Sequence, residues 1–264
     1  MMKLTRRAII LACLSTAAAF GSSAWAQTAL DTVLKSKTIK IAVPTDYPPY
    51  GSVDKNMALQ GLDIDMARLI ASKLGVTLEL VPVTSANRIA YLQTHKADLV
   101  ISTLAKTPER EQVIDFAAPY APFFQAVFAG KALGIKSFAD MGGKSVAVTR
   151  GAMEDQELAK VVPSNVDFKR FEDNNATIAA FVAGQTQTIA TSGAVAAEMI
   201  RMNPQIHAEF KLLLKNTLCY VGVAKGEDSL KAKVAGIVAS AKKDGSLDLM
   251  SQKWLGRAAG DLQD

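Results

Sequence analysis

The chain has 264 residues, of which 30 are Lys or Arg and 25 are Asp or Glu, and its formal net charge is +5. This weak positive balance and an aromatic content of 6% argue against a nucleic-acid-binding surface, which needs clustered basic and aromatic side chains. The length exceeds one typical domain, so the chain can bury either one large core or two cores of about a hundred residues each.

The first 26 residues have the order of a signal peptide. Lys3, Arg6 and Arg7 come before an apolar stretch over residues 8–20, and small residues then lead to Ala26. We predict cleavage after Ala26 and export to the periplasm, which leaves 27 basic against 25 acidic residues and a net charge of +2. The paired arginines also fit a twin-arginine signal, so the choice between this route and Sec export stays open.

Short β-branched runs alternate with helical patterns along the rest of the chain. Such alternation predicts α/β units with mostly parallel sheets. The runs that we expect to form buried strands are residues 38–43, 76–82, 99–102, 145–149 and 189–191. Between the first two, residues 61–74 follow the apolar period of a helix that ends at Gly75.

A further helix start follows the third of these strands. Thr107 is a capping residue and Pro108 suits the first helical position, so the sequence predicts a helix start that contains Arg110.

Two stretches predict crossings between lobes. Residues 119–128 lack a polar face, and the alternation of strands and helices begins again after them, so we expect the chain to cross to the second lobe here. Residues 219–224 are expected to form the crossing back to the first lobe. The helical tail over residues 228–254 is then expected to cover the first lobe.

Several segments together resemble the polar amino acid family of periplasmic solute-binding proteins, the receptors of ABC importers. They follow the family's order from Ile39 to Gly256, which covers nearly the whole mature chain. The matching stretches are residues 46–50, 61–67, 97–103, 107–110, 113–116, 142–146 and 244–256.

The resemblance implies an α/β fold, the two-lobed periplasmic binding protein of type II. Each lobe is then a mainly parallel sheet flanked by helices, and two strands form the hinge. We expect lobe 1 to comprise residues 27–122 and 221–264, and lobe 2 to comprise residues 123–220.

The resemblance also assigns ligand-binding roles in lobe 1. Tyr47 matches the aromatic residue that stacks on the ligand. Ser102 and Thr103 match the pair at a strand end that binds the ligand's carboxylate and amine. Arg110 matches the arginine that binds the α-carboxylate, and a planar guanidinium meets a carboxylate through two parallel hydrogen bonds.

Residues 85–89 indicate a narrower class of ligand. Their sequence, Ser-Ala-Asn-Arg-Ile, looks like the stretch of the glutamate and aspartate receptors in which a serine and an arginine hold the ligand's second carboxylate. The resemblance therefore implies that Ser85 and Arg88 contact a side-chain carboxylate, and two separated arginines suit a dicarboxylic ligand.

The chain departs from the family where the ligand's amine is bound. Family members place acids at the positions of Pro44 and Ser192, and the second acid pairs with the amine. Burying an unpaired ammonium group costs several kcal/mol. Either Glu154 or Asp155 therefore replaces the missing acid, or the ligand is not an ordinary α-amino acid.

A second departure follows Gly151. The threonines usual there are replaced by Ala152 and Met153, whose backbone N–H groups remain candidates for ligand contact. Ser192, at the predicted end of a lobe 2 strand, is a further candidate.

Catalytic and metal sites are not expected. His95 and His207 lie far apart and have no partner at metal-ligand spacing. The hydroxyls at positions 102 and 103 have no neighbouring histidine or lysine base. Cys219, the one cysteine of the mature chain, reads as a buried residue in a strand.

The sequence therefore predicts a monomeric, non-enzymatic periplasmic receptor without a cofactor. It would bind a polar, and by resemblance acidic, amino acid or carboxylate between its lobes and deliver it to an inner-membrane ABC permease. Two alternatives stay open. One is a periplasmic cyclohexadienyl dehydratase-like enzyme with Glu154 as its acid, and the other is a sensory solute-binding module for a carboxylate ligand.

Overall fold

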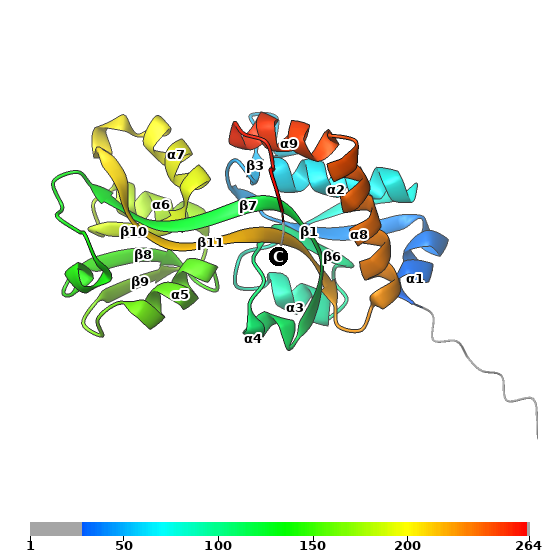
Figure 1. Ribbon diagram of the computed structural model, residues 1–264, viewed down its shortest axis with the longest axis horizontal. Helices are drawn as coiled ribbons and strands as arrows, with labels where there is room; N and C mark the ends of the chain where they lie inside the picture. Colours follow the sequence, from blue (N-terminus) through cyan, green and yellow to red (C-terminus); the bar gives the residue numbers. More distant parts are fainter. Residues whose placement is uncertain (1–27, 263–264) are drawn as a thin grey trace, which may run out of the picture.

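The computed structural model describes residues 28–262, so the predicted signal peptide and its cleavage site lie outside the described residues. Figure 1 shows two lobes side by side, connected by two long strands that extend through both. Within residues 28–262, no helix has the length and apolarity that a membrane crossing requires.

A sheet of eight strands continues through both lobes in the order β5-β1-β6-β11-β7-β10-β8-β9. Parallel pairing joins three strands in each lobe. In lobe 1 these are β1 (Thr38–Val43), β5 (Thr77–Pro82) and β6 (Leu99–Leu104), and in lobe 2 they are β8 (Ser145–Thr149), β9 (Asp167–Phe171) and β10 (Thr188–Ser192). The mainly parallel character predicted for each lobe is confirmed.

The two long strands form the connection between the lobes. They are β7 (Ile114–Gly130) and β11 (Ala208–Ala224), which pair with each other in antiparallel fashion along most of their length. A small antiparallel sheet beside lobe 1 contains β2 (Asp46–Tyr47), β3 (Gly51–Val53) and β4 (Leu59–Gln60). The predicted lobe boundaries fall within β7 and β11, and their exact positions stay a prediction.

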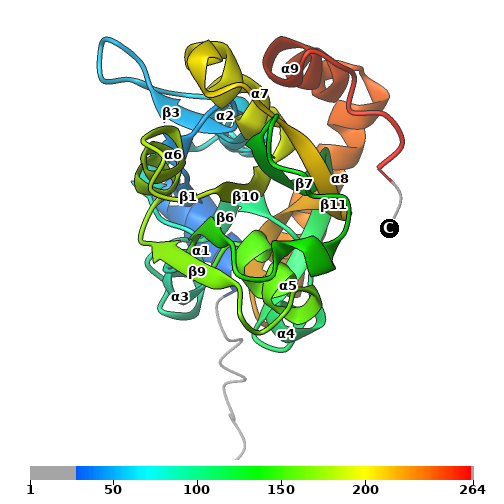
Figure 2. The same ribbon diagram turned by 90° about the vertical axis from the view of Figure 1, so that its left-hand side faces the viewer.

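Helices cover both faces of the sheet. Those of lobe 1 are α1 (Ala29–Ser36), α2 (Leu62–Leu74), α3 (Arg88–Gln93), α4 (Pro108–Glu111), α8 (Asp228–Lys243) and α9 (Ser246–Leu255). Those of lobe 2 are α5 (Met153–Val161), α6 (Asn174–Val182) and α7 (Gly193–Met202). Two short 3-10 helices lie at Phe138–Met141, before α5, and at Pro204–Ile206, after α7. Figure 2 shows α5 on the opposite side of the lobe 2 strands from α6 and α7.

Apolar clusters form a core on each face of the sheet. In lobe 1, the buried face of α2 presents Leu62, Met66 and Ile70 to the same cluster as Ile39 and Ile41 of β1. Complete burial of one such side chain stabilises the fold by about 1.5–3 kcal/mol. The helical period in the sequence therefore predicted the face of α2 that packs on the sheet.

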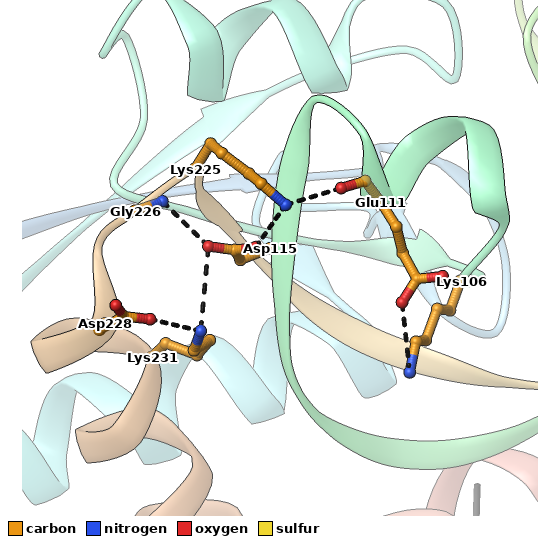
Figure 3. A network of polar contacts seen from close by, with 7 residues as sticks. All are labelled: Lys106, Glu111, Asp115, Lys225, Gly226, Asp228 and Lys231. Carbon is orange, nitrogen blue, oxygen red and sulfur yellow. Dashed lines mark hydrogen bonds and ion pairs between the residues drawn. The ribbon is translucent and has the colours of Figure 1, made fainter.

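A polar network ties the two long strands together in lobe 1 (Figure 3). The Asp115 carboxylate accepts hydrogen bonds from Lys225 Nζ and from the Gly226 N–H, both at 2.9 Å. Lys231 of α8 lies 3.9 Å from the same carboxylate. Exposed ion pairs contribute little each, about 0–1 kcal/mol. They join the start of β7 to the residues that directly follow the end of β11.

Candidate functional site

A small cavity lies where the two lobes meet. Its free volume is ≈ 10 Å³, about the space of one water molecule, so the structure shows the lobes closed. Six of the residues predicted from the sequence line it, namely Tyr47, Ser85, Arg88, Thr103, Ala152 and Met153. Glu154, one of the two acids that the sequence offered as a replacement for the missing amine partner, also lines it, and so do Phe123 and Asn174, which the sequence analysis did not single out.

Tyr47 connects lobe 1 to lobe 2 through its hydroxyl group. The hydroxyl lies 3.2 Å from Glu154 Oε1 and 3.2 Å from Thr191 Oγ1, and it accepts a hydrogen bond from the Ser192 N–H at 3.1 Å. The ring stacks on Tyr50 with centroids 5.8 Å apart. Burial, and then the charge of Glu154, raises the pKa of Tyr47, so the hydroxyl remains a donor.

Arg88 is buried at the start of α3 and lines the cavity. Its Nη1 donates to the Ser102 carbonyl oxygen, while its buried Nε has no hydrogen-bond partner among the described residues. Burial lowers the pKa of Arg88, and the charge of Glu154 opposes this shift. An unsatisfied buried donor costs about 1–3 kcal/mol, so the Nε–H is a donor that a ligand acceptor can use. Ser102 itself does not line the cavity.

Arg110 lies at the edge of the cleft rather than in the cavity lining. Thr107 caps α4 by accepting a hydrogen bond from the Arg110 N–H at 3.3 Å. The guanidinium donates to the Ala105 carbonyl at 2.8 Å and, across the cleft, to the Gly151 carbonyl at 3.3 Å. Burial, and then the charge of Arg88, lowers the pKa of Arg110 to about 9, which leaves it charged at neutral pH. Two of its five N–H groups make these bonds, and the others can receive a carboxylate.

The structure separates the two acids between which the sequence could not choose. Asp155 forms an ion pair with Arg170 at 2.7 Å and does not line the cavity. Glu154 is 3% exposed and lines the cavity beside Arg88. Burial raises the pKa of Glu154, against hydrogen bonds from its own N–H and from Tyr47.

Several known proteins are similar to this chain in sequence and in fold. The sequence profile of the bacterial extracellular solute-binding proteins, family 3, matches residues 39–257. The chain belongs to this family. The L-cystine-binding protein TcyJ of Escherichia coli is 27% identical over 229 residues, which covers 86% of each chain.

Two solved structures of amino-acid-binding proteins are similar over nearly their whole length. The solute receptor for L-cysteine of Neisseria gonorrhoeae has a TM-score of 0.81 and 29% identity, covering 89% of this chain and 96% of the receptor. The ancestral amino acid-binding protein AncCDT-1, a precursor of cyclohexadienyl dehydratase, has a TM-score of 0.79 and 32% identity, covering 85% of this chain and 98% of that protein. The two-lobed fold predicted from the sequence is therefore confirmed.

Ser192 caps a helix in this family 3 chain, whereas the resemblance assigns an acid to this position in other members. Its Oγ accepts a hydrogen bond from the Val195 N–H at 3.3 Å at the start of α7, and its own N–H donates to Tyr47. The side chain is fully buried. Ser192 therefore lies one hydrogen bond from a cavity-lining residue.

The loop before α5 approaches lobe 1 closely. Gly151 has a φ of +73°, and a Cβ atom there would lie 2.9 Å from the Ala86 Cα. Only glycine fits this backbone conformation and this contact without strain. The next N–H group, that of Ala152, donates to the Thr149 carbonyl at 3.1 Å and is thus already engaged. Met153, at the first position of α5, is buried against the apolar cluster of lobe 1.

A direct link between the lobes was not predicted from the sequence. Asp46 of β2 accepts two hydrogen bonds from Asn174 of α6, at 2.7 Å from the backbone N–H and at 3.1 Å from Nδ2. All four atoms are buried. Because the two residues are 128 positions apart and each fits a local turn or helix start, no local signal could have paired them.

Asp63 is a second residue that the sequence did not single out. This buried carboxylate of α2 accepts hydrogen bonds from the Thr103 N–H and the Tyr120 hydroxyl, both at 2.8 Å. Thr103 has a φ of 44°, a conformation that non-glycine residues rarely adopt. Asp63 thus holds the end of β6 in the conformation that places Thr103 at the cavity. Burial raises the pKa of Asp63 to about 7.

Proposed function

We propose that this protein is the periplasmic receptor of an ABC importer and that it binds an acidic amino acid between its lobes as a monomer. The observation that carries the ligand class is the pair of buried arginines, Arg88 and Arg110, at the cleft. They lie close enough that the charge of Arg88 contributes to the lowered pKa of Arg110.

Arg88 and Arg110 place two buried positive charges at the cleft, against the one buried carboxylate of Glu154. Uncompensated charge in a buried site costs several kcal/mol, so a ligand with two carboxylates suits this cleft better than a neutral amino acid. In the proposed complex Arg110 binds the α-carboxylate, and the Nε of Arg88, helped by Ser85, binds the side-chain carboxylate.

Transport requires that binding and closure are coupled. The bonds from Tyr47, Asp46 and Arg110 to lobe 2 form when the lobes close. A ligand that bridges the lobes shifts the population toward a ligand-bound closed form, which the inner-membrane permease then recognises.

The ligand class is tested by calorimetric titration of an amino acid panel that includes glutamate, aspartate, glutamine, arginine and cystine. The wild type should prefer glutamate or aspartate. Arg88→Met should reduce the preference for glutamate over glutamine at least about 10-fold, because one charge-assisted bond contributes about 1.5–3 kcal/mol. Arg201→Ala, which removes an exposed arginine of α7, is the control and should change nothing. Tighter wild-type binding of glutamine, arginine or cystine than of either acidic amino acid would show the proposed ligand class to be wrong.

A second candidate function is enzymatic, and Glu154 is the observation that favours it. A buried carboxylic acid with a raised pKa keeps its proton closer to neutral pH, as a general acid must. The similarity to a precursor of cyclohexadienyl dehydratase points to the elimination of water from prephenate or arogenate. We expect no conversion of either compound by the purified protein in a chromatographic assay. Conversion that is lost in Glu154→Gln would establish the enzyme instead.

A further inference from the structure

The cavity contains one cation and one anion from the protein. Among its lining residues, Arg88 and Glu154 are the charged side chains. The other buried carboxylates nearby are already engaged within the protein. Asp46 accepts from Asn174, and Asp63 accepts from Thr103 and Tyr120. Glu154 is therefore the carboxylate that can take a cationic group of a ligand.

The hydroxyl of Tyr47 brings Glu154 to the end of β10. This single oxygen lies 3.2 Å from Glu154 Oε1 and 3.1 Å from the Ser192 nitrogen. The acid that the resemblance led us to expect at position 192 is absent, and Ser192 uses its side chain to cap α7. The Glu154 carboxylate reaches the same end of the strand from the neighbouring helix α5.

The position of Glu154 on its helix explains why a carboxylate can be placed there. It lies in the first turn of α5, where its carboxylate interacts with its own backbone N–H and with the positive end of the helix. Within residues 28–262, its one hydrogen bond from another side chain comes from Tyr47. A carboxylate accepts up to about four hydrogen bonds, so it has capacity left for an ammonium group.

We infer that Glu154 is the residue that binds the ligand's α-ammonium group and thereby makes the protein select amino acids over the corresponding dicarboxylates. This inference rests on the proposed function. With Arg110 on the α-carboxylate and Arg88 on the side-chain carboxylate, two cations and one anion of the protein meet two anions and one cation of the ligand. The closed site is then electrically neutral, which a buried site requires.

Binding of the ammonium group by Glu154 affects which ligands the protein selects. Glutarate and succinate carry both carboxylates of glutamate and aspartate but no amine. When one of them binds, the buried carboxylate of Glu154 lacks its cationic partner and adds a negative charge to the closed site. Glu154 therefore discriminates against these compounds, and removing its charge should abolish the discrimination.

The test compares L-glutamate with glutarate and L-aspartate with succinate, titrated calorimetrically into wild type, Glu154→Gln and Glu157→Gln. Glu154→Gln should weaken binding of the amino acids at least about 30-fold and change binding of the dicarboxylates less than about 3-fold, because a lost buried ion pair costs several kcal/mol. Glu157→Gln is the matched control, since Glu157 lies on the same helix and pairs with Lys160 and Lys215 instead. It should leave all four affinities unchanged.

A rescue variant distinguishes direct binding from a structural effect. Ser192→Asp places an acid at the end of β10, and aspartate caps helices as well as serine. In the double variant Glu154→Gln with Ser192→Asp, amino acid affinity should recover at least about 10-fold over Glu154→Gln alone. Thermal unfolding of each variant shows that it is folded.

The outcomes separate this inference from the proposed function. Equal weakening of amino acids and dicarboxylates in Glu154→Gln, or no weakening of either, overturns the role of Glu154 and leaves the acidic ligand class intact. Failure of the wild type to bind any acidic amino acid overturns the proposed ligand class. In that case the amino acid that does bind is compared with its analogue lacking the amine. Weaker binding of the amino acid but not of the analogue in Glu154→Gln supports the role of Glu154, and any other result overturns it.

Discussion

Arg110→Ala should weaken binding of the preferred amino acid at least about 100-fold. Two charge-assisted hydrogen bonds to a carboxylate contribute together about 3–6 kcal/mol, and each 1.4 kcal/mol is about a factor of ten in affinity. The substitution also removes the bond from the guanidinium to the Gly151 carbonyl, which links the lobes at 3.3 Å. Isothermal titration calorimetry measures the loss.

Arg110→Lys refines this test. Lysine keeps the positive charge but cannot form the two parallel hydrogen bonds of a guanidinium group, so we expect an intermediate loss. Arg68→Ala is the control, because Arg68 is half exposed on α2 and pairs with Asp65. Undiminished affinity in Arg110→Ala would refute the assignment of this residue as the carboxylate anchor.

Asp63 should make the stability of the protein fall as the pH rises from about 4 to about 7. The fold raises the pKa of this carboxyl from 3.8 to about 7, so folding favours the protonated form. Below pH 4 both states hold the proton, and the penalty is absent. Between these pKa values the unfolded state ionises first, and stability falls by up to about 4 kcal/mol. Above pH 7 this contribution is constant.

Asp63→Asn isolates this effect from other titrating groups. The asparagine oxygen can accept from the Thr103 N–H, and its amide group can donate to the Tyr120 hydroxyl, so both bonds have a replacement. Urea unfolding at pH 4, 6 and 8 should show that the variant gains stability relative to wild type as the pH rises. A constant difference across this range would contradict the raised pKa. Asp63→Ala, which leaves the buried Thr103 N–H unpaired, should destabilise the protein at every pH.

Local patterns in the chain predicted most of the elements. β1 and β8 coincide with the predicted strands, and α2 ends at Gly75 as expected. The tail forms α8 and α9, and Cys219 is buried in β11. These features follow from apolar period, capping residues and glycine, which act within a few residues.

The sequence analysis did not predict one strand of the sheet and predicted two others as too short. β9 was not predicted, because its residues Asp-Phe-Lys-Arg-Phe lie at the sheet edge and leave the charged side chains exposed. β7 and β11 each continue for 17 residues, well beyond the predicted crossings. Their length depends on their pairing with each other, and this pairing joins segments far apart in the chain.

The candidate site was predicted only in part. The resemblance pointed to six residues that line the cavity, and their contact with a ligand stays a prediction. Asp46 with Asn174, and Asp63 with Thr103, were not foreseen. In each pair the two polar residues are remote from each other in the sequence. Because each residue has the local sequence of an ordinary cap or turn residue, no local pattern indicates its partner.

Chain order, element type and the apolar faces thus came from local chemistry along the sequence, together with the family to which the chain belongs. The sequence did not determine which of the two acids at the start of α5 enters the cleft. Glu154 and Asp155 are neighbours of the same chemical type, and both suit the first turn of a helix. The orientation of α5 against Tyr47, 107 residues away, directs the first toward the cavity and the second toward Arg170. Packing between the lobes makes that choice, because successive helical residues point about 100° apart and only one of them can face the cleft.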